Sequence, residues 1–247
     1  MNLGGKAEHR VARLLNRVQG GGMIAVREAA TLFGVSEMTV RRDIAGSRGR
    51  LAALGGHVIA VTEPEAPYAL DREQDSHLDA KLAACEQALP LIAPEDTIFI
   101  DSGTTTCHIT SRLPPDFNLT VVCFSMNVAA ILARMPTIRW MLIGGHYHTS
   151  TASFSGPQGP AMLKDIRVNK AFVSAGGVHP KLGVSCANFS EVAMKRAVIE
   201  NAAESYLVID SSKLDKVKAA HFADCSDFTA ILSERGRVPI GAKKVGV

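Results

Sequence analysis

Hydrophobic residues recur three and four positions apart in the first part of the chain, which is the spacing of amphipathic helices. The pattern predicts one helix over residues 6–19 and a second over 26–33 that ends at Gly34. A third helix is expected to begin after the N-cap Ser36 and to run to about Ala45. Three short helices in this order, with a tight turn before the last, form the helix-turn-helix pattern.

Two short apolar segments follow around the glycine pair Gly55-Gly56, and they predict a hairpin over residues 51–61. A hairpin after three helices is the wing of a winged helix. Residues 62–67 are polar and contain two prolines, which is typical of a linker. We therefore expect a winged helix-turn-helix domain over residues 1–61, a linker over 62–75 and a larger domain over 76–247.

Beyond the linker, continuous apolar runs of strand length alternate with helical stretches. Continuous apolar strands are buried on both faces, and this is typical of a parallel sheet covered by helices. The larger domain is therefore expected to be α/β. The six runs are residues 97–101, 120–124, 140–144, 171–175, 206–210 and 228–232.

The formal net charge of +3 conceals an asymmetry between the two parts. Residues 1–62 contain nine Lys and Arg against four Asp and Glu, a net +5, and the remaining residues have a net −2. A basic segment on a slightly acidic body is expected where one part meets phosphates and the other does something else. With 47% hydrophobic residues, the composition excludes a disordered or fibrous chain.

The five cysteines include no Cys-x-x-Cys pair, which predicts reduced thiols. Neither a signal peptide nor an apolar run of about 18 residues is present, so we expect a soluble cytoplasmic protein with no membrane partner. His146 and His148 lack a third ligand nearby, so no metal site is expected. Cys107 and Cys186 have no recognisable base beside them and are expected to be inert buried thiols.

The third helix offers a face to DNA. Val40 and Ile44 are four residues apart and are expected to face the core, which points Met38 and Arg42 away from it. Thr39 and Arg41 lie on the flanks, and Asp43 is expected to pair with an arginine. Arg and Thr suit both phosphates and base edges in a major groove. The alternative is that the two arginines are only a solvated surface.

At this point the residues resemble a known family. VREAATLFGVSEMTVRRD (residues 26–43) is similar to the helix-turn-helix of the DeoR family of bacterial repressors of sugar catabolism. DSGTTT (101–106), SMN (125–127), SAGGVH (174–179) and DSSK (210–213) follow in the family's order. The segment IAGSRGRLAAL (44–54) departs from it, because the usual Leu-rich linker and wing Arg are missing. We expect the DNA-contacting residues to be Ser36, Met38, Thr39, Arg41, Arg42 and His57.

The motif DSGTTT lies between an apolar strand and a predicted helix containing Ile109 and Leu113. Its glycine and threonines offer backbone N–H groups and hydroxyls to an anion such as phosphate. It is neither a Walker loop nor a dinucleotide fingerprint. The carboxyl end of a parallel strand is where open α/β sheets bind ligands. The alternative is a helix start capped by Thr104 that needs no ligand.

The resemblance implies a body similar to the ribose-phosphate isomerase and glucosamine-phosphate deaminase folds, which bind phosphorylated sugars. It places Glu191 and Lys195 at the sugar pocket, where the alternative is a surface ion pair. For Lys213 the alternative is a solvated lysine. The implied effector-binding residues are Asp101, Ser102, Gly103, Thr104, Thr105, Thr106, Ser125, Asn127, Gly144, Gly145, Gly176, Glu191, Lys195 and Lys213.

Together with the resemblance, these observations predict a repressor that binds double-stranded operator DNA and leaves it when a small phosphorylated sugar binds. The resemblance alone implies the identity of that sugar, with deoxyribose 5-phosphate favoured. At least a homodimer is expected, because one winged helix buries too little surface for operator specificity. No catalytic residue and no cofactor are expected. The alternative is an isomerase-like enzyme with a DNA-binding appendage, in which Asp101 or Glu191 would serve as the base.

Overall fold

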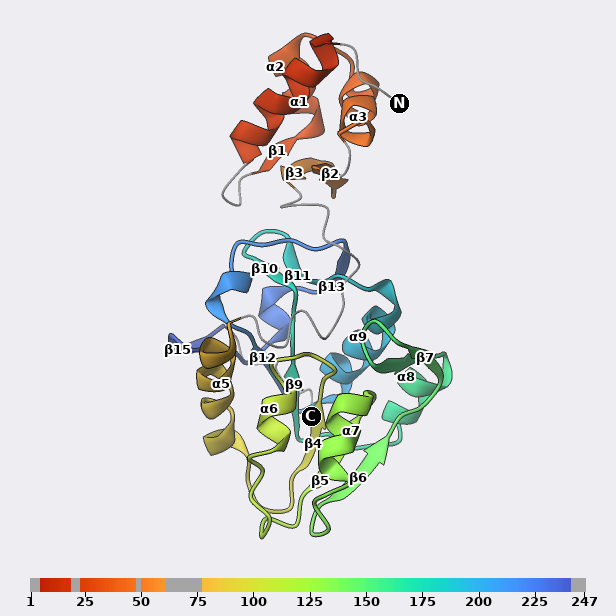
Figure 1. Ribbon diagram of the computed structural model, residues 1–247, viewed down its shortest axis with the longest axis vertical. Coiled ribbons are helices and arrows are strands. Elements are labelled where there is room, and N and C mark those ends of the chain that lie inside the picture. The colour runs from red at the N-terminus through yellow and green to blue at the C-terminus, as the bar shows by residue number, and fades with distance from the viewer. Residues whose placement is uncertain (1–4, 19–22, 48–49, 61–76, 241–247) are drawn as a thin grey trace. The chain divides into compact units, whose positions relative to one another are not determined.

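The structure is a computed structural model that describes residues 5–18, 23–47, 50–60 and 77–240 (Figure 1). The chain divides into two compact units, Met1–Pro67 and Tyr68–Val247. The predicted linker, residues 62–75, lies outside the described residues. The two units are described separately below.

The first unit contains the three predicted helices and the predicted hairpin, and a third strand that the sequence pattern missed. The additional strand, β1, pairs antiparallel with β3, so the sheet order is β1-β3-β2. One apolar cluster joins the helices to this sheet, with Val11, Val40 and Val58 fully buried. The elements are α1 (Gly5–Val18), β1 (Met23–Ala25), α2 (Val26–Phe33), α3 (Glu37–Ala45), β2 (Leu51–Leu54) and β3 (His57–Ala60).

The turn between α2 and α3 is fixed by its own residues. Gly34 ends α2 in the left-handed conformation at φ 63°, which glycine adopts without steric cost. Ser36 is the N-cap of α3, as predicted, and its hydroxyl accepts the backbone N–H of Thr39 at 3.2 Å. The sequence therefore sets the angle at which α3 leaves the turn.

The second unit is built on a seven-stranded sheet with the order β15-β14-β12-β9-β4-β5-β6. All six predicted strands are present and parallel to one another, and β15, which was not predicted, pairs antiparallel with β14. The strands are β4 (Thr97–Ile100), β5 (Thr120–Cys123), β6 (Arg139–Leu142), β9 (Lys170–Val173), β12 (Glu204–Val208), β14 (Ala230–Ser233) and β15 (Gly236–Pro239).

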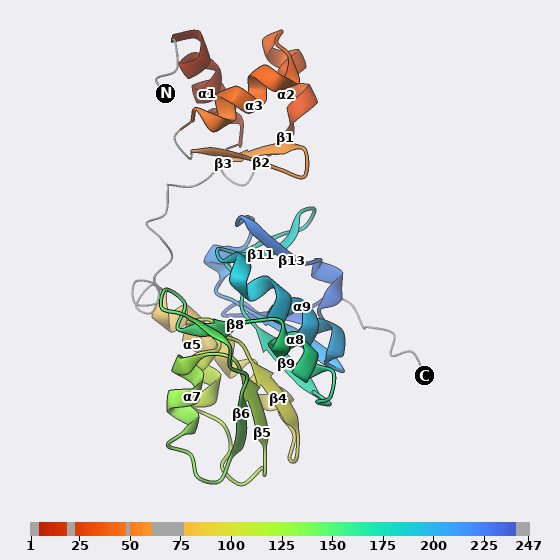
Figure 2. The same cartoon turned by 90° about the vertical axis from the view of Figure 1, so that its right-hand side faces the viewer.

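Helices cover both faces of this sheet (Figure 2). Ile98 and Ile100 of β4 pack in one apolar cluster with α5, α6 and α7, whereas Phe99 packs in a second cluster with α8 and α9. Alternate residues of one strand thus face different layers, which explains why the strands read as continuous apolar runs. The helices are α5 (Leu78–Glu86), α6 (Cys107–Thr110), α7 (Met126–Leu132), α8 (Gln158–Leu163) and α9 (Val192–Asn201).

Several short elements were not predicted, because three or four residues carry too little periodicity. A hairpin follows β6, and a small antiparallel sheet has the order β10-β11-β13. These elements are β7 (His146–His148), β8 (Ser153–Ser155), β10 (Gly177–His179), β11 (Gly183–Cys186) and β13 (Ala220–Ala223), with the 3-10 helices η1 (Leu89–Leu91), η2 (Phe189–Glu191), η3 (Ser211–Lys213) and η4 (Cys225–Asp227).

The order of the strands creates a switch point in the sheet. From β4 the chain adds β5 and β6 on one side and then returns to place β9 on the other side of β4. Open α/β sheets bind ligands outside the carboxyl ends of the strands at such a point. Asp101 directly follows β4 and Ser174 directly follows β9, so both lie at this position. No helix within the described ranges is long and apolar enough to cross a membrane.

Candidate functional site

The exposed face of α3 has the composition that the helical spacing predicted. Val40 and Ile44 are buried, Met38 is 66% exposed, and Arg41 and Arg42 are both exposed. The flanking Thr39 is partly buried, and its hydroxyl hydrogen-bonds the Ser36 hydroxyl at 3.0 Å. This face presents two guanidinium groups and carries no acidic side chain between them. Contact of these residues with DNA stays a prediction.

Asp43 is turned inward, away from this face. Its side chain is almost fully buried and accepts two hydrogen bonds from Arg10 of α1, with Nε at 2.6 Å and Nη2 at 3.0 Å. The expectation that Asp43 pairs with an arginine is confirmed. This bidentate pair fastens α3 to α1 and holds the Asp43 carboxylate on the inner side of α3.

His57, the candidate in the wing, is the first residue of β3 and is half-buried. Its ring Nδ1 lies 3.1 Å from the carbonyl oxygen of Gly55, within the turn of the hairpin. This contact within the hairpin turn helps to orient the His57 ring. Whether this ring meets DNA stays a prediction.

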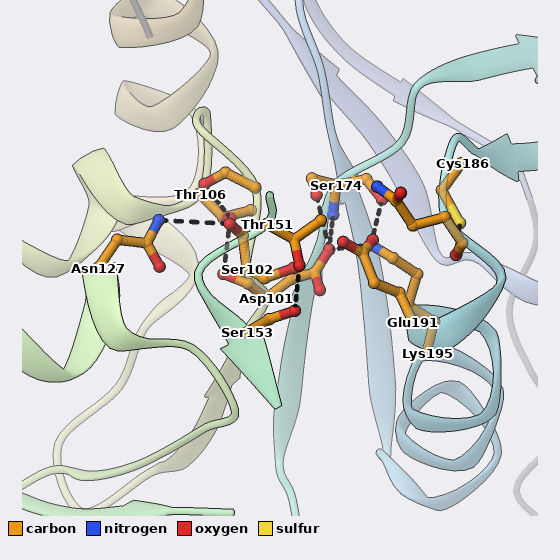
Figure 3. Close-up of polar contacts among 12 residues, drawn as sticks. Asp101, Ser102, Thr106, Asn127, Thr151, Ser153, Ser174, Cys186, Glu191 and Lys195 are labelled. Carbon is orange, nitrogen blue, oxygen red and sulfur yellow. Dashed lines mark hydrogen bonds and ion pairs between the residues drawn. The ribbon is translucent and has the colours of Figure 1, made fainter. Parts of the chain in front are cut away.

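In the second unit, the carboxylate of Asp101 joins the two strands at the switch point (Figure 3). Its Oδ2 accepts the backbone N–H of Ser174 at 2.7 Å and the Ser174 hydroxyl at 2.6 Å. The ammonium of Lys195, from α9, donates to the same oxygen. Asp101 is fully buried, so this cluster lies in a medium of low dielectric constant where unpaired charge is costly.

Lys195 and Glu191 complete the cluster. Lys195 Nζ donates to the carbonyl oxygen of Ser174 at 3.0 Å and lies 3.7 Å from Glu191 Oε2. Lys195 is 1% exposed and Glu191 is 7% exposed, so the alternative of a surface ion pair is wrong. Glu191 is the last residue of η2 and stands at the N-cap position of α9, where its side chain makes no capping hydrogen bond and lies instead beside Lys195.

The protonation states of these two groups follow from burial and from each other. Burial raises the pKa of Glu191 to about 7, and the positive charge of Lys195 limits that rise. Burial disfavours the charged form of Lys195, but the carboxylates of Asp101 and Glu191 outweigh it and hold its pKa above the usual value. Lys195 therefore stays an ammonium, whereas Glu191 changes charge near neutral pH.

Three buried polar atoms at the carboxyl edge of the sheet have no hydrogen-bond partner among the described residues. Two of them follow β4 and β5: Oδ1 of Asp101 and Oγ of Ser125, which stands two residues beyond the end of β5. The third is Oδ2 of Asp210, two residues beyond the end of β12. Buried polar groups are nearly always hydrogen-bonded. An acceptor oxygen and a hydroxyl left open at a switch point are suited to the hydroxyl groups of a ligand.

The DSGTTT segment forms a loop that is held from within. The Thr106 hydroxyl donates to the carbonyl oxygens of Asp101 at 3.0 Å and Gly103 at 3.2 Å. Gly103 is required here, because a Cβ on it would lie 2.2 Å from the hydroxyl oxygen of Ser174. Helix α6 begins only at Cys107, so the alternative that Thr104 caps it is wrong. Leu113 is buried but lies beyond the end of that helix.

The loop and the hairpin β7–β8 meet the start of α7. Asn127 Nδ2 donates to the carbonyl oxygen of Ser102 at 3.3 Å, and Figure 3 shows this contact on the opposite side of Asp101 from Lys195. Ser153 of β8 forms an isolated bridge with Ser125, and its hydroxyl lies 2.7 Å from that of Thr151. Ser174, Thr151 and Ser153 were missed as site residues, although the quoted motifs contained Ser174.

The remaining predicted effector residues lie around this centre. Thr105 is buried, and its carbonyl oxygen accepts a hydrogen bond from the thiol of Cys85 at 3.1 Å. Gly144 and Gly145 follow β6, where a Cβ on Gly145 would lie 2.4 Å from the carbonyl oxygen of Ser155. Gly145 therefore has a packing explanation in the hairpin, whereas a Cβ on Gly144 would meet nothing within 4 Å.

Gly176 and Lys213 lie on the side of β9 and β12. The N–H of Gly176 donates to the carbonyl oxygen of Ser185 at 2.9 Å, next to β11. Lys213 ends η3 and is partly buried, so it is not simply a solvated lysine. Asp210 is the N-cap of that 3-10 helix, and its Oδ1 accepts the N–H of Ser212 at 3.1 Å.

The thiols and histidines near the site do not form a reactive centre. Burial raises the pKa of Cys107 and Cys186 to about 11, so both are protonated at neutral pH. His146 and His148 share a face, with ring centroids 5.0 Å apart, and His148 Nε2 lies 2.6 Å from the Ser155 hydroxyl. Within the described part of the chain, no group of three or more metal-ligating side chains is present.

Comparison with known proteins gives matches to both units. A family model for the DeoR C terminal sensor domain matches residues 76–235, and one for the DeoR-like helix-turn-helix domain matches residues 10–48. The chain is 32% identical to the deoxyribose operon repressor of Escherichia coli (strain K12), over 93% of this chain and 91% of that protein. It is also 32% identical to the HTH-type transcriptional regulator IolR of Bacillus subtilis (strain 168), over 84% and 83%.

Solved structures share the fold at low identity. eIF2B beta from Chaetomium thermophilum matches 95% of this chain and 66% of its own, with a TM-score of 0.50 and 12% identity. Ribose 5-phosphate isomerase A from Methanocaldococcus jannaschii matches 56% of this chain and 55% of its own, with a TM-score of 0.42 and 18% identity. The first similarity concerns the fold alone, and the second is too weak to carry an argument.

Proposed function

The chain belongs to the DeoR family of transcriptional regulators, and from this we propose that it represses a sugar or deoxyribonucleoside catabolic operon and leaves its operator when a phosphorylated sugar binds. We favour deoxyribose 5-phosphate as the effector, because a relative of 32% identity is named for the deoxyribose operon. The two relatives are named as a repressor and a regulator, which gives no support to the alternative of an isomerase-like enzyme.

One observation carries the proposal for the second unit. Asp101 is held at the switch point by Ser174 and Lys195, and its other carboxylate oxygen is buried with no hydrogen-bond partner in the part of the chain that the structure describes. That oxygen can accept a hydrogen bond from a sugar hydroxyl, and the Ser125 hydroxyl can donate or accept one. The loop of residues 102–106 would hold the phosphate with its backbone N–H groups and hydroxyls.

The first unit would bind DNA through α3. Arg41 and Arg42 would reach phosphates or guanine edges, and Met38 and Thr39 would lie against the floor of the groove. A single winged helix buries too little surface for operator specificity, so we propose at least a homodimer that reads spaced half-sites. Its site of action would be the cytoplasm, where operator DNA lies.

Release from DNA follows from linkage. If the sugar phosphate binds more tightly to the arrangement of the dimer that fits the operator poorly, it weakens DNA binding, and DNA weakens its binding by the same factor. No chemical step is needed. The site has only to bind the effector with different affinity in the two arrangements.

A thermal-shift panel of sugar phosphates and their unphosphorylated sugars tests the effector class. Binding to the native state alone raises the melting temperature, by an amount that grows with the logarithm of ligand concentration above the dissociation constant. We expect deoxyribose 5-phosphate to raise it and deoxyribose to have a smaller effect. A panel in which no phosphorylated sugar raises the melting temperature would remove the proposed effector class.

A further inference from the structure

A phosphorylated effector raises a question of charge at the site. A phosphate monoester carries close to two negative charges at neutral pH. The cluster of Asp101, Glu191 and Lys195 holds two carboxyl groups and one ammonium, so its net charge is −1 with Glu191 ionised and zero with Glu191 protonated. This cluster cannot neutralise a phosphate, and the compensating charge has to come from elsewhere.

Lys195 is committed to protein acceptors. Its ammonium has three N–H donors. It meets Asp101 Oδ2, the carbonyl oxygen of Ser174 and, at 3.7 Å, Glu191. Moving it to a phosphate would leave the Asp101 carboxylate buried without its cation, which is strongly unfavourable.

A second lysine is buried on the other side of the loop. Lys81 of α5 is 1% exposed, and it and Lys195 are the two almost fully buried lysines of the described chain. Lys81 is one helical turn before Cys85, and both are on the buried face of α5. The Cys85 thiol donates to the carbonyl oxygen of Thr105 at 3.1 Å, so this face of α5 lies directly against the loop.

The positive charge of Lys81 affects the pKa values of the two residues that follow the loop, Cys107 and His108. Burial, Arg112 and Lys81 together lower the pKa of His108. Burial raises the pKa of Cys107, and Lys81 opposes that rise. The ammonium therefore acts electrostatically at the point where the loop enters α6.

The loop has donors available for the same anion. The N–H groups of residues 102–106 donate to no protein acceptor within the described ranges, and backbone hydrogen bonding resumes at Cys107, whose N–H reaches the carbonyl oxygen of Gly103 at 3.3 Å. Successive unpaired N–H groups in a loop form an anion-binding concavity. A buried cation against such a loop adds the charge that the neutral donors lack.

We propose that Lys81 supplies the positive charge for the effector's phosphate, and that the Asp101 cluster recognises the hydroxyl end of the same molecule. This rests on the proposed function and names the residue that discriminates a phosphorylated sugar from an unphosphorylated one. Because an ammonium has three donors, Lys81 can bind a phosphate while also keeping a protein contact.

The test is isothermal titration of the full chain with 2-deoxyribose 5-phosphate, 2-deoxyribose and inorganic phosphate. In Lys81→Met we expect the phosphate ester to bind about 10- to 100-fold more weakly, the usual effect of losing a charge-assisted contact. Binding of 2-deoxyribose should stay within about threefold of the wild type. Inorganic phosphate should compete with the ester in the wild type and not in Lys81→Met.

Lys170→Met is the matched control. Lys170 is also a largely buried lysine, but it pairs with Asp96 at 2.6 Å at the opposite, amino-terminal end of the strands. The Lys170→Met variant should bind the ester with the same affinity as the wild type. Lys81→Gln, which keeps a polar chain of similar length, replaces Lys81→Met if that variant does not fold.

Two results would overturn the inference. One is a folded Lys81 variant that binds the ester within about threefold of the wild type. The other is a Lys213→Met variant that loses the ester while the Lys81 variants retain it. A wild-type protein that binds the ester no better than 2-deoxyribose would instead contradict the proposed function itself, before any variant is considered.

Discussion

The carboxylate of Asp101 accepts both the backbone N–H and the hydroxyl of Ser174, at 2.7 and 2.6 Å, and so ties the end of β4 to the end of β9. These two strands lie on either side of the switch point. The strands on the β4 side (β4, β5 and β6) come from an earlier part of the chain than the strands on the β9 side (β9, β12, β14 and β15). A ligand that contacts Asp101 therefore acts on both halves of the sheet at once, which suits a site that reports occupancy.

Gly103→Ala should damage this junction. The added Cβ would meet the Oγ and Cβ atoms of Ser174 at 2.2 and 2.5 Å, far inside van der Waals contact. We expect a loss of about 1–3 kcal/mol in the free energy of unfolding, as for other overpacked sites, together with weaker effector binding. Urea unfolding of the variant, followed by the fluorescence of the single tryptophan, Trp140 in β6, measures the first effect.

Two further variants make this prediction specific. Gly144→Ala adds a methyl group where nothing lies within 4 Å, so it should leave the free energy of unfolding nearly unchanged. Combining Gly103→Ala with Ser174→Gly removes both clashing atoms and should recover part of the lost stability. A double variant that is as unstable as the sum of the two single changes would show that the clash is not the cause.

Glu191 should make stability depend on pH between about 4.5 and 7. Burial raises its pKa from 4.5 to about 7 in the folded chain, so the folded state holds the proton more tightly than the unfolded state. Its contribution to stability is greatest below pH 4.5, falls as the pH rises through this window and is constant above it. The change amounts to roughly 3 kcal/mol.

Glu191→Gln isolates this contribution, because the amide keeps the shape and does not titrate. Urea unfolding of both proteins between pH 4.5 and 8 should give a difference in unfolding free energy that changes across the window and then levels off. Parallel curves for the two proteins would mean that Glu191 does not titrate between these values.

Asp43→Asn should loosen α3 from α1. It removes the charge from a bidentate pair with Arg10 that is largely buried, and such a change costs about 1–3 kcal/mol. Hydrogen exchange of the α1 and α3 amides in the intact protein measures this locally. Glu37→Gln, on the same helix but exposed, should change exchange by less than about 0.5 kcal/mol. Equal effects from both variants would rule out a special role for the pair.

Arg42→Ala should weaken operator binding by about 10- to 100-fold without unfolding the protein, because it removes one exposed guanidinium from the face of α3. Fluorescence anisotropy on promoter DNA, beside an unrelated duplex of the same length, gives the affinity. Arg134→Ala, an exposed arginine of the second unit, controls for the loss of one positive charge. Unchanged operator affinity in Arg42→Ala would take this residue out of the interface.

The sequence was most informative where a pattern extended over several turns or strands. The three helices, the N-cap Ser36 and all six parallel strands could be predicted, because amphipathic spacing and burial on both faces leave a clear hydrophobic pattern. The strand β1 was missed because it has three residues beside a run of glycines. Helix α6, at four residues, was predicted too long for the same reason.

The site shows a similar division. Asp101, Glu191 and Lys195 could be named from motifs. The sequence could not decide whether Glu191 and Lys195 form a surface ion pair or a buried cluster, because their burial depends on how α9 packs against the sheet. Lys81 escaped notice because most lysines are exposed. Its spacing from Ala84 and Cys85 places it on the buried face of α5, and that signal was present in the sequence.

The central claim is that a phosphorylated sugar in the second unit controls DNA binding by the first. It is tested most directly by titrating the full-length protein into labelled operator DNA and measuring anisotropy with saturating 2-deoxyribose 5-phosphate, with 2-deoxyribose and with neither. The account predicts at least about a fivefold weaker operator affinity with the phosphate ester, in the usual range of allosteric coupling, and little change with the sugar. Identical operator affinities in all three titrations would contradict it.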